Sequence, residues 1–179
     1  DARVRANALT ALRRVFQALG RVEEAIVQKM MNCLSDTEHR VRADAIFNLW
    51  ELGRIESLDC IECMLQEERP EARASGAWLC GRLKLHQLKD ALQHLLRDRE
   101  WNVRKTAAVA LLSFGESGRQ MLVSIARTGT PEEQVSAAFA LGLDHDAEGI
   151  ERLFLNSRNG EELSQGATDL LLRFARPVP

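Results

Sequence analysis

The residues that could carry chemistry are a pair of cysteines and a few histidines. Cys60 and Cys63 have the CxxC spacing used for zinc binding and for thiol–disulfide exchange. No second CxxC follows, and the surrounding SLDCIECML is typical of one amphipathic helix. The four histidines are scattered, and none forms the i, i+4 pair that would suit a metal on a helix. We therefore expect no metal and no cofactor, and reduced thiols at Cys33, Cys60, Cys63 and Cys80.

Composition and motifs argue against several classes of function. The 179 residues contain no Gly-rich phosphate loop, nucleophile elbow or metal-ligand cluster, so we expect a protein without enzymatic activity. The net charge of −2 argues against a dedicated binder of duplex DNA, which needs a basic excess to neutralise phosphates. No apolar run is long enough for a membrane helix. These features predict a cytoplasmic protein of bacterial type.

The elements that would position any site are internal repeats. Three segments align without gaps, and each starts 31 residues after the one before: LSDTEHRVRADAIFNLWELG from Leu34, LQEERPEARASGAWLCGRLK from Leu65 and LRDREWNVRKTAAVALLSFG from Leu96. A fourth copy begins at Val4, a weaker fifth at Pro131 and a degenerate sixth at Glu162. Repetition at this period indicates stacked supersecondary units that share one core.

Each copy has one apolar helix face. We number each copy from position 0, the residue before the repeated arginine. Position 0 is Val4, Val41, Ala72, Val103 and, loosely, Val135. Apolar or small residues then recur at positions 4, 8 and 11, which share one side of an α-helix. A second amphipathic helix is predicted before each copy except the first, over 23–34, 57–65, 87–96, 119–126 and 148–155. C-cap glycines are predicted at Gly53, Gly115 and Gly142. The repeat is thus a helical hairpin.

An acidic residue stands six positions before an arginine in three copies: Asp36 and Arg42, Glu67 and Arg73, Asp98 and Arg104. These residues resemble the HEAT repeat, specifically the short variant first associated with phycobilin lyases. The resemblance implies that the six residues form a charge ladder between successive repeats. Ser136 replaces the arginine in the fifth copy, which puts the ladder there in doubt.

The resemblance also implies the architecture. We expect an all-α fold, a right-handed α-α superhelix (α-solenoid) of about five to six HEAT-like hairpins. One such domain would cover residues 1–179, with a half repeat at 1–20 and repeats at 22–53, 55–84, 86–115, 117–143 and 146–176. The first copy lacks a preceding helix, which leaves Val4, Ala8, Leu12 and Val15 half uncovered. We therefore expect a fragment of a longer protein, a partner over this end, or self-association through it.

The face opposite the core, at positions 2, 6, 9 and 13, is unusually apolar. Large side chains there predict a concave groove for another protein or peptide, formed by Phe47, Trp50, Trp78, Val109 and Leu112. Alternatively, the same side chains fill gaps between adjacent helices. The preferred function is an interaction scaffold or adaptor. The alternatives are a phycobilin-lyase-like enzyme subunit or chaperone, and a nucleic-acid-binding HEAT-like protein that uses Trp50 and Trp78 beside Asp44 and Glu51.

Overall fold

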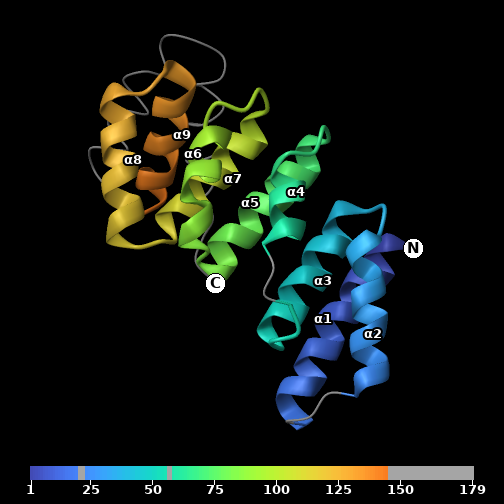
Figure 1. Cartoon of the computed structure of the whole chain (residues 1–179). Coiled ribbons are helices and arrows are strands. Elements are labelled where there is room, and N and C mark those ends of the chain that lie inside the picture. Colours follow the sequence, from blue (N-terminus) through green and yellow to red (C-terminus); the bar gives the residue numbers. More distant parts are fainter. Residues whose placement is uncertain (20–22, 56–57, 145–179) are drawn as a thin grey trace, which may run out of the picture. The chain divides into compact units, whose positions relative to one another are not determined.

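The computed structural model describes residues 1–19, 23–55 and 58–144, and every regular element in these ranges is helical (Figure 1). The α-helices are α1 (Ala2–Leu19), α2 (Glu24–Asn32), α3 (His39–Glu51), α4 (Asp59–Leu65), α5 (Pro70–Leu83), α6 (Lys89–Leu95), α7 (Trp101–Leu112), α8 (Glu116–Thr128) and α9 (Pro131–Leu143), with short 3₁₀ turns η1 (Cys33–Ser35) and η2 (His86–Leu88). The predicted all-α class is confirmed. The sixth copy lies outside the described residues, so its hairpin stays a prediction.

Helices alternate in the way that the repeat predicts. A first helix (α2, α4, α6 or α8) is followed by a turn and a second helix (α3, α5, α7 or α9) that carries the aligned positions. Gly53 and Gly115 have the positive φ of helix-ending glycines, 64° and 74°. The same prediction is wrong at Gly142, because α9 continues through it to Leu143. None of the helices in the described part of the chain has the length and apolar character to cross a membrane.

The chain divides into two compact units, of which the first covers Asp1–Leu79. One core cluster of this unit joins three helices: Leu9 and Phe16 of α1, Val27 and Met30 of α2, and Val41, Ala45 and Leu49 of α3. In the next hairpin, Leu65 of α4 lies so close to Gly76 of α5 that a Cβ there would be 3.0 Å from its Cδ2. Small residues at position 4 thus let the two helices of a hairpin approach closely. The single continuous solenoid over 1–179 stays a prediction.

The second unit begins at Cys80 and includes α6, α7, α8 and α9. Trp101 is the first residue of α7 and packs edge-on against Phe139 of α9, with ring centroids 5.5 Å apart. Gly118 of α8 lies against the end of α7, where a Cβ would stand only 1.8 Å from the carbonyl oxygen of Leu111. Close approach of α8 to α7 therefore depends on the missing side chain.

The substitution Gly118→Ala should destabilise the protein, although Ala favours a helix over Gly by about 1 kcal/mol in the absence of contacts. The methyl group would overlap a backbone oxygen that cannot move without shifting α7, and we expect a loss of about 1–3 kcal/mol in the free energy of unfolding. Urea unfolding of Gly118→Ala and of Ser117→Ala, at the exposed neighbouring position, measures this. Equal or greater stability of Gly118→Ala would contradict the packing.

Candidate functional site

The arginine that follows position 0 closes the turn of its own hairpin. Arg42 Nη1 donates hydrogen bonds to the carbonyl oxygens of Asp36 at 2.9 Å and Thr37 at 3.4 Å. The same pair of bonds, to the residues six and five positions earlier, recurs at Arg73 with 2.7 and 2.7 Å and at Arg104 with 2.6 and 3.0 Å. One guanidinium thus donates to two carbonyl groups that lack a helical partner where the chain reverses, and the Thr37 carbonyl also accepts from Arg69 Nη1 at 3.2 Å.

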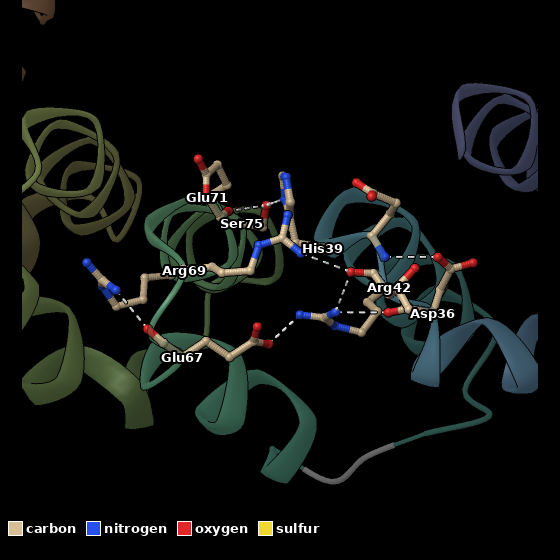
Figure 2. A network of polar contacts seen from close by, with 10 residues as sticks. Asp36, His39, Arg42, Glu67, Arg69, Glu71 and Ser75 are labelled. Carbon is tan, nitrogen blue, oxygen red and sulfur yellow. Dashed lines mark hydrogen bonds and ion pairs between the residues drawn. The ribbon is translucent and has the colours of Figure 1, made fainter. Parts of the chain in front are cut away.

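Arg42, and Arg5 at the equivalent position of α1, also reach the acidic residue of the following turn. Arg5 donates from Nε and Nη2 to the two carboxylate oxygens of Asp36, at 2.7 and 2.8 Å. Arg42 forms an ion pair with Glu67, which Figure 2 shows. These hydrogen bonds from Arg5, with a further one from the backbone N–H of Glu38, lower the pKa of Asp36. Each of these two ion pairs links a second helix to the turn of the next repeat.

Arg5 was absent from the predicted set, and the alignment could have found it. The dipeptide Val4–Arg5 matches Val41–Arg42, and Arg5 lies 31 residues before its partner Asp36. The acid and the arginine six residues apart, such as Asp36 and Arg42, are joined through a backbone carbonyl instead of the carboxylate. Sequence spacing within one copy therefore identified the right residue types but not the carboxylate pairs.

The fifth copy uses the opposite arrangement of charges. Ser136 stands in place of the arginine, is buried, and donates to the carbonyl oxygen of Glu132 in its own helix. The link to the preceding repeat is made by Arg97, whose Nε donates to Glu133 at 2.8 Å, while the N–H of Thr130 donates to the other carboxylate oxygen. Glu133 is 2% exposed and forms a capping box at the start of α9.

The pKa of Glu133 reflects two opposing effects. Burial raises it, but the hydrogen bonds from Thr130 and Arg97 outweigh burial, so the pKa lies below its usual value of 4.5. The sequence signal that could have revealed this residue is T-P-E-E, in which a threonine at the N-cap is followed three positions later by glutamate.

One histidine contacts a serine, but the geometry does not favour catalysis. His39 Nδ1 lies 2.8 Å from Ser75 Oγ, and that hydroxyl donates to the carbonyl oxygen of Glu71 (Figure 2). The serine proton is thus directed at the backbone, and the hydroxyl oxygen accepts from the imidazole. Burial, with a smaller effect of Arg69, lowers the pKa of His39. The pair joins α3 to α5 and does not present an activated nucleophile.

The cysteines do not gather into a site within the described residues. All four are free thiols, and no group of three potential metal ligands occurs in the ranges that the structure describes. Cys80 is buried, which raises the pKa of its thiol to about 12 and keeps it protonated at neutral pH. Burial also raises the pKa of Cys33, and Cys63 is exposed on α4.

The predicted groove residues differ in exposure. Trp78 on α5 is 40% exposed and Val109 on α7 is 37% exposed, both at position 6 of their copies. Phe47, at position 6 of α3, is only 8% exposed, and Trp50 and Leu112 at position 9 are half-buried. Phe47 therefore agrees with the alternative that these side chains fill gaps between helices, and the groove of five residues stays a prediction.

Phe47 is buried because its ring lies between two other groups of the first unit. The Phe47 and Trp78 rings are tilted by 54° with centroids 5.8 Å apart, and the guanidinium of Arg13 lies 5.5 Å from the Phe47 centroid on the α1 side. Position 2 is closed as well, since Ala43 and Ala74 are both buried. Small residues at position 2 allow neighbouring second helices to pack side by side.

The substitution Arg42→Met should cost stability, because it removes the donor to two turn carbonyls and the partner of Glu67. We expect a loss of about 1–3 kcal/mol in the free energy of unfolding. The matched control is Arg40→Met, which removes the same charge at an exposed position two residues earlier. Urea denaturation of both variants measures the loss of stability. An equal loss in the two variants would mean that Arg42 contributes only its charge.

The substitution Glu133→Gln should reduce the loss of stability that the protein shows as the pH falls. The unfolded chain takes up a proton near pH 4.5 and the native state only at lower pH, so the stabilisation by Glu133 is complete above pH 4.5 and is lost as the pH falls. The variant should be less stable than wild type at pH 7 and converge with it in acid. Melting temperatures between pH 7 and pH 3, with Glu132→Gln as the exposed control, measure this. Parallel profiles would refute it.

Comparison with known proteins agrees with this repeat geometry. No curated protein matches the chain. The family model described as HEAT repeats matches residues 27–112 and 57–143, which together cover the described hairpins from α2 to α9. The chain therefore belongs to the HEAT-repeat family.

Proposed function

We propose that the protein is an interaction module that binds a partner protein through the surface around Trp78, without catalysing a reaction. The observation that carries the proposal is the exposure of a large aromatic side chain on a well-packed helix. Trp78 is 40% exposed, whereas its neighbours in α5, Ala77 and Leu79, are fully buried. Tryptophan is enriched among residues that dominate binding energies, and its burial by a partner would remove a large apolar area from water.

The support beneath Trp78 suits such a role. Its ring rests on Phe47, which is itself held under Arg13, so the three side chains connect α5, α3 and α1 of the first unit. Aromatic rings that are fixed by packing lose little conformational entropy on binding. Phe47 is then a positioning residue, and Trp78 is the residue that contacts the partner.

Position 6 is open again in the second unit, where Val109 is 37% exposed on α7. Of the four large hydrophobic residues that are exposed in the described ranges, Trp78 and Val109 share this repeat position, and the other two lie on α1. Recurrence at one repeat position favours selection for a surface over chance exposure. The lyase-like and nucleic-acid-binding alternatives stay predictions.

The substitution Trp78→Ala should abolish partner binding and leave the fold stable, because the indole is already partly in water. The test is a pull-down with the tagged chain. The proteins that wild type retains are compared with those that Trp78→Ala and the matched variant Trp78→Phe retain. We expect a partner that is kept by Trp78→Phe, lost with Trp78→Ala and lost with the Trp50→Ala, Trp78→Ala double variant. The melting temperature of Trp78→Ala should fall by less than about 4 °C.

Two results would overturn the proposal. Retention of the same proteins by wild type and Trp78→Ala would show that this surface does not bind them. A fall of more than about 8 °C in the melting temperature of Trp78→Ala would show that the indole is a packing residue between helices.

A further inference from the structure

A second apolar surface lies on α1, separate from Trp78. Val4 is 64% exposed and Val15 is 47% exposed, and Ala8 and Ala11 between them are exposed as well. Their spacing of four, three and four residues places all four on one side of the helix. We call these four residues the open α1 face. The opposite side of α1, with Ala6, Leu9 and Phe16, is buried in the core of the first unit.

The equivalent positions of other second helices are covered. Positions 0, 4 and 7 of α3 are Val41, Ala45 and Asn48, and all three are at most 2% exposed. The corresponding residues of α7, Val103, Ala107 and Ala110, are also buried, as is Phe114 just after the helix. Positions 0, 4 and 7 are therefore closed in both α3 and α7, and the residues there are apolar except for Asn48, whereas in α1 positions 0, 4, 7 and 11 are apolar and open.

The structure shows what covers this face elsewhere. In α3 it packs in one cluster with Val27 and Met30 of α2, and in α5 its position 4, Gly76, touches Leu65 of α4. Both α2 and α4 are the first helices of their hairpins and run antiparallel to the helix they cover, since only a short turn joins them. The open α1 face thus has the form of a docking site for one more helix of this type.

The charges on α1 indicate which kind of helix fits the open α1 face. Every first helix in the described hairpins has an acidic residue in its first turn: Glu24 in α2, Asp59 and Glu62 in α4, Asp90 in α6 and Glu116 in α8. Acidic side chains at this end also favour the helix dipole. By contrast, α1 contains four arginines and no acidic residue, and Arg14 is exposed beside Val15 near the end that would meet this first turn.

At the corresponding end of two hairpins in the chain, a charged residue near the start of the first helix pairs with an opposite charge just after the second helix. Arg54, just after α3, lies 3.1 Å from Glu24 at the start of α2, and Asp144, just after α9, lies 3.7 Å from Arg119 near the start of α8. A second copy of the chain would fit less well. Two α1 helices packed antiparallel would bring Arg3 of each towards Arg14 of the other, and like charges in contact oppose binding.

We propose that the open α1 face binds an amphipathic α-helix with acidic residues in its first turn, aligned antiparallel to α1 with those residues beside Arg14. The apolar side of the incoming helix packs on Val4, Ala8, Ala11 and Val15, as α2 packs on α3. This surface is distinct from the one around Trp78, so either can be occupied without the other.

The test uses the full chain and a labelled synthetic peptide with the sequence of residues 23–36, in which Cys33→Ser removes the thiol. This peptide copies the helix that covers the same face of α3, and it begins with Glu23 and Glu24. Fluorescence anisotropy should show saturable binding, with a dissociation constant of about 10–500 µM because so short a helix must fold as it binds.

Two kinds of variant locate the binding surface. Ala8→Glu and Ala11→Glu place a charged, longer side chain in the middle of the open α1 face and should weaken binding about tenfold or more. The matched control Ser124→Glu adds the same charge at an exposed position of α8 and should leave binding unchanged. Arg14→Glu should weaken binding of the peptide and strengthen binding of its Glu23→Lys, Glu24→Lys form.

Several results would overturn the proposal. One is no binding up to about 1 mM peptide, and another is equal binding by wild type, Ala8→Glu and Ala11→Glu. Equal affinity of the acidic and lysine peptides for both wild type and Arg14→Glu would show that the open α1 face does not select acidic residues in the first turn of the bound helix. A dimer in sedimentation equilibrium that Ala11→Glu dissociates would show that a second copy occupies the face. Circular dichroism of each variant confirms its helix content, and Arg14→Glu tests the same surface without altering its apolar residues.

Discussion

The hairpins depend on the hydrogen bonds that the arginine after position 0 donates to the carbonyl groups of its own turn. A short turn between two helices leaves carbonyl groups without helical partners, and a side chain that spans six residues back can satisfy two of them at once. Arg42, Arg73 and Arg104 do this with the same Nη1 atom, and Arg42 uses Nη2 for the acid of the next turn. Arginine suits the position because its planar fork donates in two directions, whereas a lysine ammonium is one compact charge.

The fifth copy shows that the contact matters more than the residue that makes it. With Ser136 in place of the arginine, Glu133 reaches back to Arg97 and also caps α9. The charge on each side of the junction is exchanged, but an ion pair still joins one repeat to the next. Because such pairs are partly exposed, their main effect is to fix the register of neighbouring hairpins, while apolar packing supplies most of the stability.

Packing of the second helices decides which apolar residues remain available for binding. Small side chains at position 2 bring the helices together, and this closeness buries Ala43 and Ala74 and encloses Phe47. Trp78, whose ring contacts Phe47, stays 40% exposed. The large exposed hydrophobic residues of the described ranges consequently fall into two sets, position 6 of α5 and α7, and the open α1 face.

The sequence by itself determined the helical hairpins, their 31-residue register and the residue types at each junction. These follow from the local apolar periodicity, from turn glycines at Gly53 and Gly115, and from the spacing of acid and arginine in the three aligned copies. Only the tertiary structure decided that Arg5 is the partner of Asp36, that Glu133 replaces the missing arginine link, and that Phe47 is buried while Trp78 is exposed. The physical reason is that carboxylate pairing and exposure depend on how closely adjacent helices approach, and residues from different repeats set that distance together.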